Sequence, residues 1–345
     1  MFFAATQPDL ADRYSRQILF RGIGAQGQQH LAGAHAAVVG VGATGAATAQ
    51  LLARAGVGQL TILDRDFVEP SNLQRQVLFD EADARAALPK AEAARRKLAG
   101  INSDCRVTAH VADLVPGNIE ELLQQAQIVL DCTDNFETRY LLNDYAVSTG
   151  KPWIYAAAVG GYAATMNILP GETACLSCLF PAPPTGAVET CDTAGILSTA
   201  VNFAASLQTT EALKYLTRQP EIMRRTLLSY DLWSGEHSEV RASKPRTGCE
   251  VCGERRFRYL AGEARPHITL CGRNSVQIHE HNRPLDLVEL RQRLEPLGEV
   301  RSNDMLLRFA RGEHTITVFP DGRALIHGTT DTALARSLYA RFIGS

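Results

Sequence analysis

One segment near the N-terminus, residues 36–76, limits the possible folds of this chain more than any other. It begins with a short apolar run, Ala36–Val39, which is typical of a buried strand. Three glycines follow in G-x-G-x-x-G spacing: Gly40, Gly42 and Gly45. Residues 46–55 then continue with helical periodicity. A glycine pattern alone would also fit a purely structural turn, so the residues after it decide the interpretation.

A second apolar run, residues 60–63, ends in Asp64, about twenty residues after the glycines. Folds that bind nucleotides place a carboxylate there to meet the ribose hydroxyls. The N-terminus of a helix has unpaired N–H groups and partial positive charge, so an anion at residues 43–45, beginning with Ala43, would be stabilised. The segment therefore predicts half of a nucleotide-binding unit.

The residues after Asp64 distinguish this chain from an ordinary dehydrogenase. They read DFVEPSNLQRQ from Asp66 to Gln76, and their polar side chains suit a triphosphate. Together with Asp64 they resemble the D-x-D-x-V-x-x-S-N-L-x-R-Q signature of MoeB/ThiF-type adenylyltransferases, which are related to the ubiquitin-activating enzymes. The resemblance extends from about Arg13 to Gly253.

This resemblance implies an α/β fold, a doubly wound, mostly parallel, Rossmann-like sheet. Alternating strands and helices along residues 81–148 favour the same fold. The resemblance also implies that ATP and Mg²⁺ bind at one pocket. The residues expected there are Gly40, Gly42, Ala43, Gly45, Asp64, Asp66, Asn72, Arg75, Gln76, Lys90, Asp134 and Asn135.

The resemblance implies catalytic roles for two basic residues in addition to Arg75. In the family, the second arginine of R-Y-x-R-Q reaches the ATP phosphates of a partner subunit, which would be Arg16 in a homodimer. The lysine after the proline of Leu88-Pro89-Lys90 contacts the phosphates during adenylyl transfer. Judged without the family, Arg16 would be part of a solvated helix face, and Lys90 would be exposed.

The apolar run 128–131 ends in Asp131-Cys132-Thr133-Asp134-Asn135, at the edge where open α/β sheets hold their ligands. Forming an acyl-adenylate crowds anions together, and an aspartate can supply the hard oxygen ligand of a magnesium ion that offsets them. By resemblance to the family's D-x-x-D-N, Asp134 is the magnesium-associated acid, while Asp131 shapes the site. Asp134 or Asn135 could equally cap the helix expected at 136–148.

Two C-x-x-C pairs, far apart in the sequence, predict a structural zinc site: Cys175 with Cys178, and Cys249 with Cys252. One pair alone could be a redox couple. Between the pairs, residues 180–194 read as a crossover loop that contains Cys191. In some family members the cysteine there joins the activated carrier or takes part in sulfur transfer. Cys191 is therefore a candidate catalytic residue or an inert, partly buried thiol.

After about residue 253 the composition changes, and residues 254–345 predict a small α+β domain. We expect strands at 267–278, 305–309, 315–319 and 324–327, and helices at 285–294 and 331–342. The domain is too short for the rhodanese domain that some relatives have. Carrier recognition and dimer contact are its possible roles.

Composition narrows the class of protein. A net charge of −2 argues against a nucleic-acid binder, and no apolar run is long enough for a membrane span. The N-terminus lacks the basic and apolar regions of a secretory signal, so we expect a cytoplasmic protein.

The sequence therefore predicts an adenylyltransferase that activates the C-terminal glycine of a ubiquitin-like sulfur-carrier protein, which ends in Gly-Gly. A sulfurtransferase or cysteine desulfurase could then supply the sulfur for a thiocarboxylate. An NAD-dependent oxidoreductase and a catalytically silent scaffold partner remain the alternatives. The sequence names neither the carrier nor its pathway.

Overall fold

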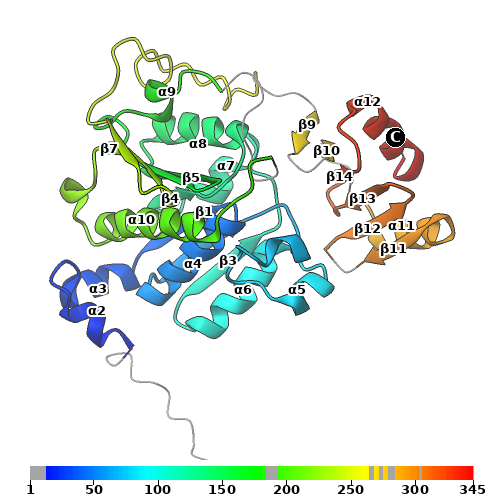
Figure 1. Cartoon of the computed structure of the whole chain (residues 1–345), viewed down its shortest axis with the longest axis horizontal. Helices are drawn as coiled ribbons and strands as arrows, with labels where there is room; N and C mark the ends of the chain where they lie inside the picture. The colour runs from blue at the N-terminus through cyan, green and yellow to red at the C-terminus, as the bar shows by residue number, and fades with distance from the viewer. Residues whose placement is uncertain are drawn as a thin grey trace, which may run out of the picture. The chain divides into compact units, whose positions relative to one another are not determined.

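The computed structural model describes residues 13–183, 193–263, 268–271, 275–278, 284–302 and 305–344. The chain forms two compact units, Met1–Ala264 and Arg265–Ser345 (Figure 1). The domain boundary predicted from the sequence, after residue 253, lies slightly before the boundary in the structure. Each unit has its own sheet.

The larger unit is built on an eight-stranded sheet with the order β3-β2-β1-β4-β5-β6-β7-β8. Strands β1 to β5 pair in parallel, and the pairs from β5 to β8 are antiparallel. The strands are β1 (His35–Val39), β2 (Gln59–Leu63), β3 (Arg106–His110), β4 (Ile128–Asp131), β5 (Trp153–Val159), β6 (Tyr162–Ile168), β7 (Thr226–Asp231) and β8 (His237–Arg241). The chain order reverses between β1 and β4, so this unit has the doubly wound topology that the sequence predicted.

Helices cover both faces of this sheet (Figure 1). One buried cluster joins Val38 and Leu130 to α3, α4, α6 and α10, and a second joins Val39 and Val129 to α7 and α8. Alternate residues of the same strands therefore face opposite layers, which explains why these strands read as continuous apolar runs. The helices are α2 (Ser15–Leu19), α3 (Gly24–Ala32), α4 (Ala43–Ala55), α5 (Glu81–Arg85), α6 (Lys90–Ile101), α7 (Ile119–Leu123), α8 (Phe136–Thr149), α9 (Leu176–Leu179) and α10 (Ser198–Leu216), with 3-10 turns η1 (Pro70–Asn72) and η2 (Pro220–Ile222).

The smaller unit has a six-stranded sheet with the order β11-β12-β13-β14-β10-β9, antiparallel throughout. Its elements are β9 (Ile268–Cys271), β10 (Ser275–Ile278), α11 (Leu287–Leu294), η3 (Glu295–Leu297), β11 (Glu299–Ser302), β12 (Leu307–Arg311), β13 (His314–Val318), β14 (Ala324–His327) and α12 (Thr332–Phe342). The single strand expected at 267–278 is wrong, because two antiparallel strands occupy that range. The α+β class of the unit is confirmed.

Among the helices of the described ranges, none combines the length and the apolar character that crossing a membrane requires.

Candidate active site and zinc centre

The glycine turn lies between β1 and α4, and two of its glycines are required by geometry. A Cβ on Gly45 would lie 1.8 Å from the carbonyl oxygen of Gly40, so only glycine fits there. Gly40 has a φ of +82°, in the left-handed region that favours glycine. At Gly42, by contrast, the nearest atom to an added Cβ is Nε2 of Gln76, at 3.8 Å. The turn therefore leaves open space over Gly42 at the N-terminus of α4, where Ala43 begins the helix.

Asp64 follows β2 and holds the glycine turn from the side. Its Oδ2 accepts the backbone N–H of Val41 at 2.7 Å, and its Oδ1 accepts that of Asp66, also at 2.7 Å. Burial raises the pKa of Asp64, and the Lys90 ammonium group opposes that shift. The carboxylate predicted to bind the ribose thus also orients the turn, as its position one residue beyond β2 allows.

Lys90 is buried, with only 3% of its surface exposed, so the alternative of an exposed, solvated lysine is wrong. It is the first residue of α6, and its backbone N–H donates to the Asp66 carbonyl at 2.8 Å. Its ammonium nitrogen lies 3.1 Å from Oδ2 of Asp66. A buried lysine beside a nucleotide-type turn is a cation held ready for an anion, because its side chain is already ordered and largely desolvated.

In the polar segment after Asp66, some side chains stabilise the local backbone, and one has a polar atom without a partner among the described residues. Asn72 is fully buried, and its Oδ1 accepts the Glu69 N–H at 3.1 Å, so it caps η1. Arg75 donates to the Ser71 carbonyl at 2.8 Å and is partly exposed. Gln76 is 3% exposed, yet its Oε1 has no hydrogen-bond partner within the described part of the chain. A buried unpaired amide oxygen beside the glycine turn is consistent with a ligand that would satisfy it.

The end of β4 adjoins the same turn, because Val39 of β1 pairs with Asp131 of β4. An added Cβ on Gly40 would lie 3.0 Å from the Cys132 carbonyl oxygen. Asp131 is fully buried, and its Oδ1 accepts both the N–H and the hydroxyl of Thr133, at 3.0 and 2.7 Å. Asp131 therefore sets the path of the chain into Asp134.

A buried arginine that the sequence analysis missed supports this loop from the other side. Arg139 donates to the Thr133 carbonyl at 2.6 Å and to the Ala156 carbonyl at 3.2 Å, and its Nε lies 3.3 Å from Oδ2 of Asp131. Its guanidinium group also lies 4.9 Å from the centre of the Tyr155 ring. The signal was available: Arg139 is four residues after Asn135, so it points back toward the start of α8.

Asp134 itself is exposed, in the loop between β4 and α8. Asn135 is the N-cap of α8, and its Oδ1 accepts the Thr138 N–H at 2.8 Å. The capping alternative is therefore confirmed for Asn135. Asp134 makes no corresponding cap, and its carboxylate is accessible at the carboxyl edge of the sheet, as a metal-associated acid must be.

We expect Arg139→Met to lower the free energy of unfolding by about 3–5 kcal/mol, because it leaves the buried Asp131 carboxylate unpaired. Urea titration followed by circular dichroism would measure the loss. Arg85→Gln is the matched control, since Arg85 pairs with Glu81 on the surface at 71% and 79% side-chain exposure and should cost less than about 1 kcal/mol. Equal losses in the two variants would contradict this account of the Arg139–Asp131 pair.

Two other candidate residues are not brought to this cluster within the described chain. Arg16 is exposed on α2, on the surface of the larger unit. Cys191 lies outside the described residues, as does most of the predicted crossover loop. The structure thus brings the glycine turn, Asp64, Asp66, Gln76 and Lys90 together, with the Asp131–Asn135 loop on the adjoining strand.

Four cysteines from distant segments meet in a separate cluster, as the two C-x-x-C pairs predicted. Cys175 is the N-cap of α9 and Cys178 lies within that helix, while Cys249 and Cys252 lie on a tight turn. That turn requires Gly253, where an added Cβ would lie 2.7 Å from the Cys249 carbonyl oxygen. The backbone N–H of Arg246 donates to the Cys178 sulfur at 3.3 Å.

The spacing of the sulfurs fits zinc. Neighbouring Sγ atoms are 3.7 Å apart for Cys175 and Cys178, 3.7 Å for Cys175 and Cys249, and 3.4 Å for Cys178 and Cys252. A tetrahedron with Zn–S bonds of about 2.3 Å has edges of about 3.8 Å. The contact with the Cys175 sulfur lowers the pKa of the Cys178 thiol, which favours a thiolate there. Because four protein sulfurs would leave no open coordination position, a zinc ion bound there would be structural.

Comparisons with known proteins agree with this architecture. The model of the ThiF family matches residues 14–251. The chain is 48% identical to the sulfur carrier protein ThiS adenylyltransferase of Bacillus subtilis (strain 168), over 97% of this chain and 100% of that protein. It is 35% identical to the adenylyltransferase and sulfurtransferase MOCS3 of Drosophila persimilis, over 84% of this chain but only 62% of that longer protein.

Among solved structures, the E. coli MccB complex with ATP has a similar fold, with a TM-score of 0.61 and 24% identity over 70% of this chain and 74% of that one. That similarity concerns the fold alone. The family match covers more than half of the chain, and the Bacillus relative is similar along almost its whole length. The chain therefore belongs to the ThiF family and is an adenylyltransferase.

Proposed function

We propose that this enzyme uses ATP to adenylate the C-terminal glycine carboxylate of a small ubiquitin-like sulfur-carrier protein. One arrangement supports this most directly. The buried ammonium group of Lys90, the N-terminus of α4 and the loop of Asp134 stand at the carboxyl ends of neighbouring parallel strands. The relative with 48% identity is named for adenylyl transfer to a sulfur carrier, ThiS.

The reaction requires two anions to meet. A carboxylate oxygen of the carrier attacks the α-phosphorus of ATP, the bond from that phosphorus to the bridging oxygen breaks, and pyrophosphate leaves with the electron pair. The N–H groups at Ala43–Gly45 would bind phosphate oxygens, while Lys90 and Arg75 would offset negative charge. Asp64 would bind the ribose hydroxyls, and Asp66 would hold Lys90 in place until the nucleotide binds.

Magnesium supplies a divalent charge that shields the phosphates, and the accessible carboxylate of Asp134 would hold it. Asn72 and Gln76 would shape the pocket, with the unpaired oxygen of Gln76 facing the ligand.

We further propose a homodimer in which Arg16 reaches the partner's phosphates, and a cytoplasmic location. Sulfur from a sulfurtransferase or cysteine desulfurase would then replace AMP, with Cys191 as a candidate participant.

Exchange of labelled pyrophosphate into ATP tests the proposal. We expect exchange only when a carrier ending in Gly-Gly is present, and we expect Asp134→Ala to lower its rate by about 10²-fold or more, since a metal-associated charge is lost. The Asp134 variant should keep the zinc content and thermal stability of the parent, because this side chain is exposed.

The alternatives predict other results. A change in nicotinamide absorbance with small alcohols, without pyrophosphate exchange, would support an NAD-dependent oxidoreductase. Carrier binding without exchange would support a silent scaffold partner. Full exchange activity in the Asp134 variant would contradict the role given to that residue.

A further inference from the structure

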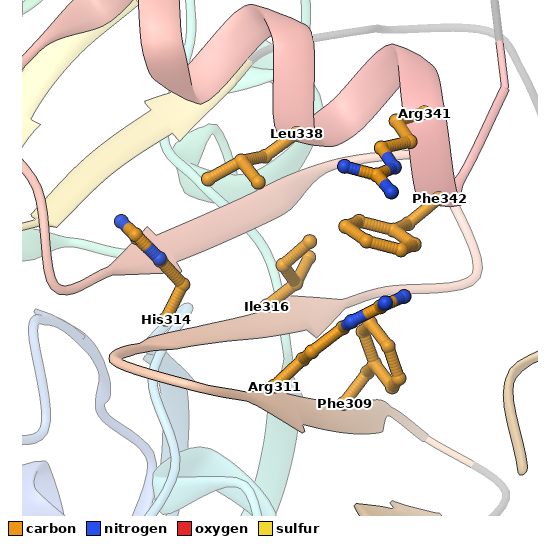
Figure 2. A pocket seen from close by; sticks show the side chains of 7 residues that line it. All are labelled: Phe309, Arg311, His314, Ile316, Leu338, Arg341 and Phe342. Carbon is orange, nitrogen blue, oxygen red and sulfur yellow. The ribbon is translucent and has the colours of Figure 1, made fainter. Parts of the chain in front are cut away.

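The smaller unit has a pocket of its own, with a cavity volume of about 160 Å³. Its floor is apolar and consists of Phe309, Ile316, Leu338 and Phe342. Three side chains that can donate hydrogen bonds to an anion stand at its edge: Arg311, His314 and Arg341 (Figure 2). All of these residues belong to the strands β12 and β13 and the helix α12, so the pocket lies within one compact unit.

Strand register explains why charged and apolar side chains meet there. In the antiparallel β12–β13 pair, Phe309 lies opposite Ile316, and Arg311 lies opposite His314. Residues two apart on a strand share a face, so Arg311 and His314 extend the buried face of the sheet past its apolar core. The C-terminal half of α12, with Leu338, Arg341 and Phe342, lies over the two strands of the hairpin (Figure 2).

The two arginines hold an aromatic ring between them. The guanidinium carbon of Arg311 lies 5.5 Å from the centre of the Phe342 ring, and that of Arg341 lies 5.2 Å from it. Figure 2 shows the Phe342 ring between the two guanidinium groups. Such cation–π contacts fix the positions of the charges without neutralising them.

Neither arginine has an acidic partner within the described ranges of the smaller unit. Two other arginines of this unit do: Arg291 pairs with Glu295 at 2.7 Å, and Arg301 pairs with Glu299 at 2.7 Å. Capping of α12 does not explain Arg341 either. The carbonyls of Phe342 and Ile343 at the end of α12 already accept from Arg293, at 3.0 and 2.9 Å.

A pocket with an apolar floor and two guanidinium groups that lack acidic partners in the described part of this unit suits a ligand with an apolar body and an anionic group. The apolar floor favours a flat or compact hydrocarbon body, and a cavity of about 150 Å³ is large enough for a benzene ring. Guanidinium groups bind phosphate and carboxylate through charge-assisted hydrogen bonds. His314 provides a further polar contact at the edge.

We propose that this pocket is a binding site for a small organic anion, with a ring-sized apolar body against Phe309, Ile316 and Leu338 and a phosphate or carboxylate group held by Arg341, while Arg311, on the other side of the Phe342 ring, adds positive charge. The site is separate from the nucleotide-binding cluster, since all its residues belong to the smaller unit. It does not depend on the proposed adenylation reaction.

Ligand-detected NMR and calorimetry on the full-length protein would test the site, with phenyl phosphate and benzoate as probes. We expect at least one of them to bind with a dissociation constant in the millimolar range or lower, as small fragments do. Benzyl alcohol, which has the ring without the charge, and inorganic phosphate, which has the charge without the ring, should each bind at least about tenfold more weakly. The tighter of the two anionic probes identifies the preferred head group.

Three variants would show whether the anionic probe binds in this pocket. Arg341→Gln should weaken binding of the anionic probe by about tenfold or more. Arg336→Gln is the matched control, because Arg336 is an exposed arginine of the same helix that does not line the pocket. Leu338→Trp should abolish binding by filling the cavity, and thermal melts would show that each variant is folded.

Three results would overturn the proposal. One is that neither anionic probe binds at about 20 mM. Another is that benzyl alcohol binds as tightly as the anions. The third is that Arg336→Gln weakens binding as much as Arg341→Gln does.

Discussion

Lys90→Met is expected to lower the rate of carrier-dependent pyrophosphate exchange by about 10²–10³-fold, the usual cost of removing one charge-stabilising group from a transition state. The ammonium group is 3% exposed and lies 3.1 Å from Asp66, so it is already desolvated and positioned before ATP arrives. Methionine keeps most of the length and volume of the side chain. The loss should therefore reflect the missing charge instead of a cavity.

The matched control is Lys97→Met, on the same helix. Lys97 pairs with Asp83 at 3.1 Å, and its side chain is 32% exposed. We expect this variant to exchange pyrophosphate at close to the parent rate. If Lys90→Met and Lys97→Met are equally active, Lys90 is not the phosphate-binding lysine. Lys90→Arg keeps the positive charge and should therefore retain part of the exchange rate if that charge stabilises the transition state.

The sequence predicted the nucleotide-binding half of the fold well because its signals are local. Gly45 must be glycine for the turn to close on Gly40, and the apolar runs of β1 and β2 are buried on both faces of a parallel sheet. Asp64 follows directly from the end of β2, so counting along the chain was enough to place it beside the turn.

Other elements were not predicted because local pattern does not determine them. β7 is only partly buried and β8 is exposed along its length, so neither has the apolar run of a core strand. Residues 13–31 have an amphipathic pattern that favours one continuous helix, but the chain breaks between α2 and α3, where Phe20 adopts an extended conformation. These strands and this break depend on pairing and packing with distant residues.

The candidate site also contains residues whose roles depend on distant contacts and could not be predicted from local pattern. Arg139 is in an ordinary helical stretch, and only the fold reveals that it lies under Thr133 and beside Asp131. Gln208 is a second case, since it comes from α10 and donates to the carbonyls of Asp131 and Ile154, both at 2.8 Å. The pocket in the smaller unit depends on the register of β12 with β13, which residue spacing alone does not specify.

Cys249→Ser is expected to remove zinc and to lower the melting temperature by about 6–12 °C, which corresponds to a loss of about 3 kcal/mol in a domain of this size. The effect should be large because the metal would join α9, a helix of only four residues, to a turn more than 70 residues later, and neither of these two short segments is long enough to be stable alone. A chelator should produce a similar shift in the parent protein. Measured zinc should fall from about one ion per chain to none.

Cys105→Ser distinguishes this effect from the general cost of altering a buried cysteine. Cys105 is 5% exposed, and burial raises the pKa of its thiol to about 11, so it is an inert core residue and no metal ligand. That variant should keep its zinc and lose only the smaller energy of a polar atom placed in the core. A parent protein that contains no zinc when purified, and whose melting temperature a chelator leaves unchanged, would contradict a structural metal centre. The close approach of the four sulfurs would then need another explanation, because three buried thiols and one partly buried thiol gain little from lying together without a metal.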